Sequence, residues 1–385
     1  MPVMARVLKR DLTPALNRLC PNISDDVEQA FRDEFPACES FTEINVSMHL
    51  LRVVAKVSGS LFVGRDLAWT EAYIDMAINY TVESSGAVQA ILSLKPWKRL
   101  FKAKSLPEVR RLRQRTEEAY HFLRPLVSSR RTAAKIPGYK KPDDMVQWLM
   151  DDGQGELKDE ELAEVQLMLT AAAIHTTSLT AINAFYTLAA FSEIVSELRS
   201  EISDVLAECE TFTSAALSKM RKLVSFLRES VRCNPLSWKS FSRKVLKNVT
   251  LSDGQVIPAG CMIQVAADAV AHDPDRVPDP ERFDAFRSYR ARNEAPKMSS
   301  ENGVASGSDA GNQLVTVGVL DMAFGYGRHA CPSRFLAATE LKLIIARALL
   351  DFDIKLADGT TGRYPNVEFA GLVSGTTLTQ LVWCD

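Results

Sequence analysis

Apolar residues recur at spacings of three and four over most of the chain, which is the pattern of amphipathic helices. The clearest early runs lie at 12–18, 25–34, 41–61 and 108–126. Between residues 159 and 191 neither proline nor glycine interrupts the pattern. We expect one helix there, and at about 1.5 Å per residue it spans roughly 50 Å. Because its middle is apolar on nearly every side, this helix is predicted to run through the core.

The second half of the chain mixes helices with short strands. Alternating apolar and polar residues at 244–265, with turn sequences at 252–254 and 258–260, predict strands. Residues 295–312 are rich in serine, glycine and asparagine, so we expect a flexible loop. Helices are also expected at 192–208, 213–234 and 334–350, and strands in the tail at 352–385. The pattern predicts a mostly α fold with a small mixed β region, built as a single domain over residues 1–385.

Composition narrows the class of protein. Of 385 residues, 46% are hydrophobic and 24% charged, which excludes a disordered or collagen-like chain. The net charge of −2 gives no reason to expect a nucleic-acid partner. The first residues lack the apolar core of a secretory signal, and no run of 18 apolar residues predicts a transmembrane helix. Seven cysteines without a CxxC pair favour reduced thiols over a disulfide framework or a zinc site.

Cys331 stands in an unusual setting. It follows a loop containing Gly325 and Gly327 and precedes Pro332, a residue that favours the first position of a helix. We therefore expect its sulfur at a helix N-terminus, where free N–H groups and the macrodipole stabilise a thiolate. Two cationic side chains precede it, Arg328 and His329, and a third, Arg334, follows it. Such a cysteine could be a nucleophile, a redox switch or a metal ligand. A phosphate-binding loop is disfavoured, because FGYGRHACPS lacks a GK[ST] ending and does not match GxGxxG.

This loop resembles the haem-thiolate loop of the cytochrome P450 family, whose pattern is FxxGx[RH]xCxG. Phe324, Gly327, His329 and Cys331 match it at the right offsets. The resemblance implies that Cys331 is the proximal thiolate ligand of the iron of haem b, that Phe324 covers the sulfur and that His329 meets a haem propionate. By the same resemblance Arg328 is counted among the cofactor-binding residues, and Arg243 is expected by position as a second propionate partner.

Further motifs occur in the order typical of this family. ESVR (229–232) resembles its ExxR motif and PERF (280–283) follows, which implies a network of Glu229, Arg232 and Arg282. AAIHTTS (172–178) resembles the long distal helix. There Thr176 falls on the threonine that delivers protons during dioxygen activation, and His175 replaces an acid and can relay protons. Alternatively, the Thr176 hydroxyl bonds back to its own helix and His175 only packs.

The resemblance to fungal members that oxidise terpenoids, such as ent-kaurene-oxidase-like enzymes, implies a function. That function is monooxygenation of an apolar, terpenoid-like secondary metabolite by dioxygen. NADPH–cytochrome P450 reductase would supply the electrons, docking near Arg328, Arg334 and Lys342. By family, the enzyme is expected at the cytosolic face of the endoplasmic reticulum membrane; this chain by itself is expected to be cytoplasmic or peripheral. The alternatives are a truncated, non-catalytic haem-binding remnant and a haem-thiolate isomerase or dehydratase.

The chain also departs from the family. It is shorter, and it is expected to lack the anchor helix and the first strands, leaving apolar residues exposed around 256–265. Ser333 stands where the family has a glycine, which adds a side chain at a crowded place. In the family's WxxxR motif the tryptophan is missing, and Lys9 or Arg10 could stand at the cationic position.

Overall fold

A computed structural model describes residues 2–37, 40–152, 157–294, 312–357, 360, 362–369, 372–375 and 380–384. Two compact units make up the chain. The first consists of Met1–Ala37 and Ser47–Ser178, and the second of Cys38–Val46 and Leu179–Asp385. The flexible loop predicted at 295–312 lies outside the described residues except for Asn312. The single domain over 1–385 stays a prediction.

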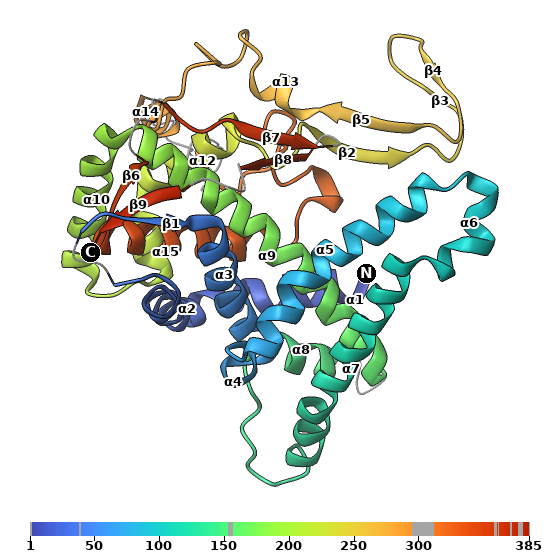
Figure 1. Cartoon of the computed structure of the whole chain (residues 1–385). Helices are drawn as coiled ribbons and strands as arrows, with labels where there is room; N and C mark the ends of the chain where they lie inside the picture. Colours follow the sequence, from blue (N-terminus) through green and yellow to red (C-terminus); the bar gives the residue numbers. More distant parts are fainter. Residues whose placement is uncertain are drawn as a thin grey trace, which may run out of the picture. The chain divides into compact units, whose positions relative to one another are not determined.

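The first unit is helical. Its elements are α1 (Pro2–Val7), the π-helical η1 (Leu8–Leu12), α2 (Thr13–Glu34), α3 (Val46–Val63), α4 (Arg65–Ala68), α5 (Glu71–Ser93), α6 (Pro96–Lys102), η2 (Ala103–Ser105), α7 (Pro107–Ala133), α8 (Met145–Asp152) and the first part of α9 (Asp159–Ala190). The predicted runs at 12–18 and 25–34 are continuous in α2, apart from Leu12, which ends η1. Pro21 lies inside this helix without ending it. Figure 1 shows α5 and α7 packed side by side, with α6 at the turn between them.

The core of the first unit contains a buried ion pair as well as apolar side chains. Lys56 on α3 lies 2.6 Å from Glu34 on α2, and both side chains are almost fully buried. Gly59 on the same helix allows Tyr73 of α5 to approach, since a Cβ there would come within 2.6 Å of the tyrosine ring. Any larger residue at position 59 would therefore push α5 away from α3.

Two helices are long and apolar enough to cross a membrane by length and composition, namely α3 and α9. The share of the apolar window that is buried inside the structure is 67% for α3 and 56% for α9. The cations of α3 are also paired: Arg52 and Lys56 both bind Glu34. Both helices therefore have the features of core helices of a folded protein, as predicted for 159–191.

The second unit combines helices with small sheets. After the end of α9 come η3 (Ser192–Ile194), α10 (Val195–Cys209), α11 (Ser214–Lys219), α12 (Arg221–Cys233), α13 (Ala267–Ala271), α14 (Arg287–Glu294), η5 (Gly327–His329) and α15 (Arg334–Asp351). The helix predicted at 213–234 is two helices, because the backbone breaks at Met220 (φ −74°, ψ 70°). The predicted helix at 41–61 begins instead with a strand, and only from Val46 onward is it helical.

All strand pairs among the described residues are antiparallel. The largest sheet has the order β1 (Thr42–Asn45), β9 (Gln380–Cys384), β6 (Asp353–Leu356), with Thr42 opposite Trp383. Three two-stranded sheets pair β2 (Lys239–Lys244) with β5 (Met262–Ala266), β3 (Val249–Thr250) with β4 (Val256–Ile257), and β7 (Asn366–Phe369) with β8 (Leu372–Gly375). The predicted fold class, mostly α with a small β region, is confirmed.

Exposed apolar side chains lie on the β2–β5 and β3–β4 sheets. In the chain β3 and β4 come between β2 and β5, and they form the outer end of this extension (Figure 1). Leu246, Val249, Val256 and Met262 all face solvent. The expectation of exposed apolar residues in this region is confirmed.

Candidate active site

The loop that carries Cys331 is closed by its own backbone. Its two glycines have positive φ angles, 76° at Gly325 and 65° at Gly327, a conformation that other residues rarely adopt. Three backbone hydrogen bonds hold it: the N–H of Gly325 to the carbonyl of Met322 (2.9 Å), that of Ala330 to Gly327 (3.0 Å) and that of Cys331 to Phe324 (2.8 Å). The cysteine is therefore presented from a rigid turn.

The helix after this loop begins at Arg334, as predicted for 334–350, but Pro332 is not its first residue. α15 starts at Arg334, so Pro332 precedes the helix and Cys331 lies three residues before its first residue. Ser333 has φ −97° and ψ 14°, a negative-φ conformation open to any residue. Serine in place of the family's glycine thus strains no backbone here. The Cys331 sulfur is half-buried, and 3.8 Å separates it from the Ser333 hydroxyl.

The cations near Cys331 divide into two kinds. Arg328 and His329 are exposed. Arg334 is turned inward, where its guanidinium donates to the carbonyls of Cys331 (3.0 Å) and Val315 (3.2 Å). Arg328 and His329 are thus open to an anionic group outside the loop, whereas Arg334 holds the loop itself. A half-buried thiol beside exposed cations suits a group that has both a metal and carboxylates.

The strand β2 contacts the same loop. The Ser240 hydroxyl donates to the carbonyl of Met322 (3.2 Å), and the ring of Phe241 lies 6.3 Å from that of Tyr326. Phe241 has a φ of 55° at an irregularity of the β2–β5 pairing, and its ring lies under the Arg243 guanidinium at 4.2 Å. The predicted residue Arg243 is therefore held on a strand that is fastened to the cysteine loop.

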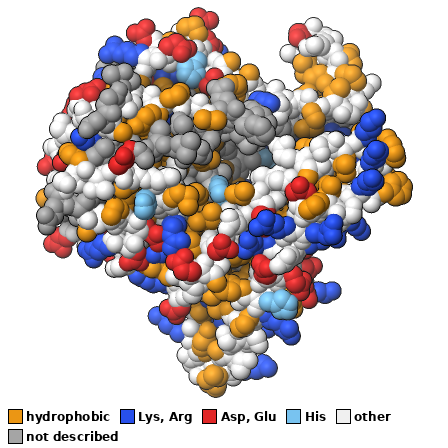
Figure 2. Space-filling view, in the orientation of Figure 1, with side chains coloured by type: hydrophobic (Ala, Val, Ile, Leu, Met, Phe, Trp, Pro, Cys, Tyr) orange, Lys and Arg blue, Asp and Glu red, His pale blue; other side chains and the backbone are white. Residues whose placement is uncertain are grey.

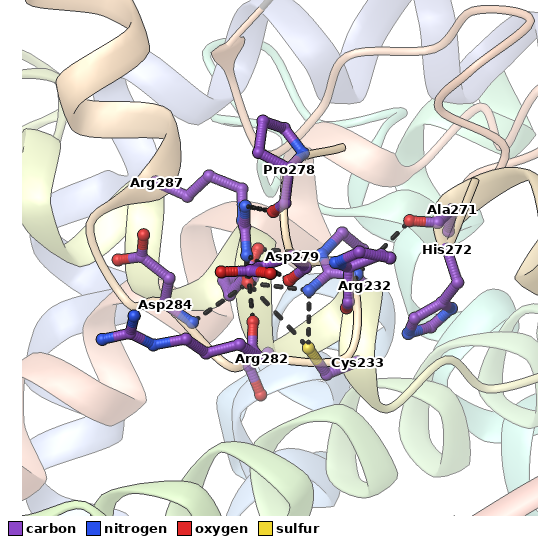
Figure 3. Close-up of polar contacts among 12 residues, drawn as sticks. Arg232, Cys233, Ala271, His272, Pro278, Asp279, Arg282, Asp284 and Arg287 are labelled. Atoms are coloured by element: carbon purple, nitrogen blue, oxygen red, sulfur yellow. Dashed lines mark hydrogen bonds and ion pairs between the residues drawn. The ribbon is translucent and has the colours of Figure 1, made fainter. Parts of the chain in front are cut away.

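A buried carboxylate organises the segment around PERF (Figure 3). The side chain of Glu229 on α12 is only 2% exposed, and both of its oxygens accept from Arg232, at 2.8 and 2.9 Å. The second arginine is Arg287 at the start of α14, whose Nε lies 3.1 Å from Glu229. The backbone N–H of Asp284 also donates to this carboxylate (3.1 Å). The predicted Glu229–Arg232 pair is confirmed.

The predicted third member of this network was wrong. The Arg282 side chain is exposed, and it is the carbonyl of Arg282 that takes part, by accepting from Arg287 at 2.9 Å. Arg287 also donates to the carbonyls of Pro278 and Asp279. Because Asp279 has a positive φ of 47°, the chain turns sharply before PERF, and Arg287 closes that turn from the next helix. Sequence reasoning missed Arg287 because only the fold brings it back to Glu229.

A thiol lies against the same cluster. Cys233 follows Arg232, whose Nη2 lies 3.1 Å from the cysteine sulfur. Burial raises the pKa of Cys233 to about 11, although the neighbouring Arg232 acts in the opposite direction. Cys233 is thus a protonated thiol packed against the arginine cluster.

His175 and Thr176 lie in the first unit, on α9. The Nε2 atom of His175 is 2.9 Å from the carbonyl oxygen of Ile78 on α5. Thr176 is exposed, and its hydroxyl donates to the carbonyl of Ala172 one turn earlier (2.7 Å). This is the back-bonded arrangement that the sequence left as an alternative. The structure places these two residues in one unit and the predicted Cys331, His329, Phe324, Gly327, Arg328 and Arg243 in the other.

The two candidates for the family's cationic WxxxR position also lie in the first unit. Arg10 is paired with Asp11 (2.7 Å) and Asp152 (2.5 Å), and Lys9 is exposed. Arg10 is therefore committed to carboxylates.

The profile of the cytochrome P450 family matches residues 4–383. The chain belongs to the cytochrome P450 family. The P450 monooxygenase ATR3 of Stachybotrys chlorohalonatus is 36% identical over 95% of this chain and 76% of its own length. BOA4 of Botryotinia fuckeliana is 35% identical over 92% of this chain and 69% of its own length, and paxP of Penicillium paxilli 35% identical over 90% and 66%. The chain thus spans about two thirds to three quarters of these relatives.

The fold is shared with a solved P450. A cyanobacterial CYP120A1 with bound retinoic acid matches 99% of this chain and 77% of its own length, with a TM-score of 0.73 and 20% identity. The predicted family and enzyme class are confirmed: this is a P450 monooxygenase, and its family uses haem, dioxygen and a redox partner.

Proposed function

We propose that this P450 inserts one oxygen atom of dioxygen into an apolar, terpenoid-like small molecule. NADPH supplies two electrons through a P450 reductase, and the second oxygen atom leaves as water after two protons are delivered. The observation that carries the proposal is the half-buried thiol of Cys331, which a hydrogen-bonded loop presents. The similarity to fungal P450 monooxygenases supports the same reaction class.

Cys331 is proposed to hold haem b through its thiolate. Haem bound in this way supplies the dioxygen chemistry, and the protein supplies the ligand, the orientation and the proton path. The apolar ring of Phe324 is proposed to cover the sulfur, while His329 and Arg243 are proposed to bind the two propionates. Arg243 is pre-oriented for this by its stacking on Phe241. Gly327 provides a left-handed turn between Phe324 and Cys331.

Thr176 is proposed to deliver protons. Its hydroxyl is exposed and donates to Ala172, so it needs only a rotation about its side chain to donate elsewhere. We expect Thr176→Ala to divert NADPH electrons into hydrogen peroxide, while Thr176→Ser retains coupling. Measuring peroxide and product per NADPH in both variants tests the assignment. Equal coupling in Thr176→Ala and the wild type would exclude this role.

Arg328 is the residue proposed to meet the reductase. It is exposed within the cysteine loop, three residues before Cys331. Arg334, also expected there from the sequence, is engaged in hydrogen bonds within the loop. Charge reversal in Arg328→Glu is therefore expected to slow electron transfer from an acidic donor more than charge reversal on a distant surface.

Association with a membrane surface is proposed for the first unit. We define the α6 surface as Trp97, Leu100 and Phe101, which are 64%, 82% and 81% exposed, together with Lys95, Lys98, Lys102 and Lys104. Between Glu83 and Glu108 the sequence contains no acidic residue. Figure 2 shows orange apolar and blue basic side chains together on the arm that ends in α6. Exposed apolar groups ringed by cations suit an anionic lipid surface.

One experiment tests the proposed reaction. The purified, haem-loaded enzyme with a P450 reductase and NADPH is incubated with diterpene and sesquiterpene hydrocarbons under ¹⁸O₂. The proposal predicts products that carry a single ¹⁸O atom and require NADPH. A product formed without NADPH would instead identify an isomerase or dehydratase. A thiolate spectrum without turnover of any apolar substrate would identify a non-catalytic haem binder.

A further inference from the structure

His175 forms a contact between two helices of the first unit. Its Nε2 lies 2.9 Å from the carbonyl oxygen of Ile78, which is 97 residues earlier in the chain. Ile78 is inside α5, where one lone pair of each carbonyl oxygen serves the helix and the other is free to accept. Figure 1 shows α5 passing beside α9 in this region. A side chain of α9 thus holds the backbone of α5.

The chemistry of this contact fixes the state of one ring nitrogen. A carbonyl oxygen can only accept, so the Nε2 atom must carry the proton. An amide carbonyl is a very weak base and does not take up that proton. A histidine relays protons by accepting a proton at one ring nitrogen and releasing one from the other. Here the proton on Nε2 is directed at the carbonyl oxygen of Ile78, which cannot pass it on. The contact therefore suits an anchor better than a relay.

The neighbouring residue faces elsewhere. His175 is half-buried against α5, whereas Thr176 is exposed and bonds to Ala172. Successive helical residues differ by about 100° around the axis, so the two side chains leave α9 on different faces. A second side chain of α9 makes the same kind of contact, since Gln166 donates to the carbonyl of Phe62 on α3 (3.2 Å). Polar side chains on two faces of α9 thus fix neighbouring helices by their backbones.

We infer that His175 is a positioning residue, which holds α5 against the part of α9 that carries Thr176 by donating its Nε2–H to Ile78. The role does not require His175 to gain or lose a proton during turnover. It rests on the proposed monooxygenation only where turnover is the readout, because the anchoring itself is measurable without substrate.

Three substitutions separate anchoring from relaying. His175→Gln keeps an N–H donor near the position of Nε2, His175→Leu removes the donor at similar size, and His175→Glu offers a titrating group that cannot donate to Ile78 when ionised. The exposed His121 on α7 contacts Glu117 and Tyr120, both on its own helix, so His121→Gln is the matched control. All variants are compared as haem-loaded enzymes.

The first measurement is hydrogen exchange of the α5 peptide, residues 71–93, without substrate. Loss of one hydrogen bond should speed exchange there about fivefold in His175→Leu and His175→Glu. His175→Gln and His121→Gln should match the wild type. Unchanged exchange in both His175→Leu and His175→Glu would overturn the inference.

The second measurement is product formed per NADPH. Anchoring predicts that His175→Gln retains coupling and that His175→Glu loses it along with His175→Leu. Relaying predicts the reverse order, with His175→Glu active and His175→Gln impaired, and that result would overturn the inference. If His175→Leu fails to fold, the comparison of the glutamine and glutamate variants decides between the two. If no variant and no wild type turns over, the exchange result still stands, and only the proposed reaction fails.

Discussion

The Nε atom of Arg287 lies 3.1 Å from Oε1 of Glu229. Arg287 is thus the second arginine of this carboxylate, where the PERF motif implied Arg282. Glu229 is almost completely buried, so its charge depends on Arg232 and Arg287 together. Arg287 in addition donates to three backbone carbonyls of the turn at 278–282. The carboxylate, two arginines and this turn therefore form one hydrogen-bonded network at the C-terminal end of α12.

Stability measurements should separate the two arginines. Arg287→Ala leaves a buried carboxylate with one cation and removes three donors from the turn, so we expect a loss of about 3 kcal/mol in the free energy of unfolding. Arg282→Ala changes an exposed side chain, and we expect a change within about 0.5 kcal/mol. Urea unfolding of the haem-loaded proteins measures both. A larger loss in Arg282→Ala than in Arg287→Ala would contradict the arrangement in Figure 3.

Cys233 should make stability depend on pH. Its pKa is raised from 9.0 to about 11, so the folded state holds the thiol proton more tightly than the unfolded chain. That contribution is fully present below pH 9.0 and is lost as the pH rises through about 11. The free energy of unfolding of the wild type should thus fall relative to that of Cys233→Ala across this window. A constant difference between the two proteins from pH 8.5 to 11 would argue against a buried, protonated thiol.

The α6 surface should bind anionic vesicles. Replacing Trp97, Leu100 and Phe101 together by serine removes the apolar contacts, and we expect partitioning onto phosphatidylserine vesicles to fall by about tenfold or more. Neutral phosphatidylcholine vesicles should bind the wild type more weakly, because the lysines then gain no electrostatic attraction.

A matched control is available on the other unit. Leu246 and Met262 are also exposed apolar residues, but they lie beside the β2–β5 sheet. Serine at these two positions should leave vesicle binding unchanged. If this pair reduces binding as much as the α6 substitutions do, adsorption is unspecific and the α6 surface has no special role.

The sequence predicted those features that depend on local spacing. Helical periodicity located α9 to within one residue at its C-terminal end, and the spacing of Phe324, Gly327, His329 and Cys331 located the loop. The glycine angles agree with the tight turn that this spacing requires. The helix and the loop are both determined by residues close together in sequence, so they can be predicted without knowing the tertiary structure.

The features that were missed depend on the path of the chain. Arg287 reaches Glu229 only because the backbone turns at Asp279, and no pattern marks a positive φ at an aspartate there. His175 meets Ile78 across 97 residues. The break at Met220 and the inclusion of Pro21 in α2 were likewise not marked by the local pattern of residues.

The central claim is that Cys331 is the thiolate that holds haem. The difference spectrum of the reduced, carbon-monoxide-bound protein measures this directly, because a thiolate ligand shifts the Soret band far to the red of an imidazole- or water-ligated haem. We predict the thiolate band in the wild type and in Cys261→Ser, whose thiol is exposed and distant in sequence from the loop, and its complete loss in Cys331→Ser. A thiolate band that persists in Cys331→Ser would contradict the account.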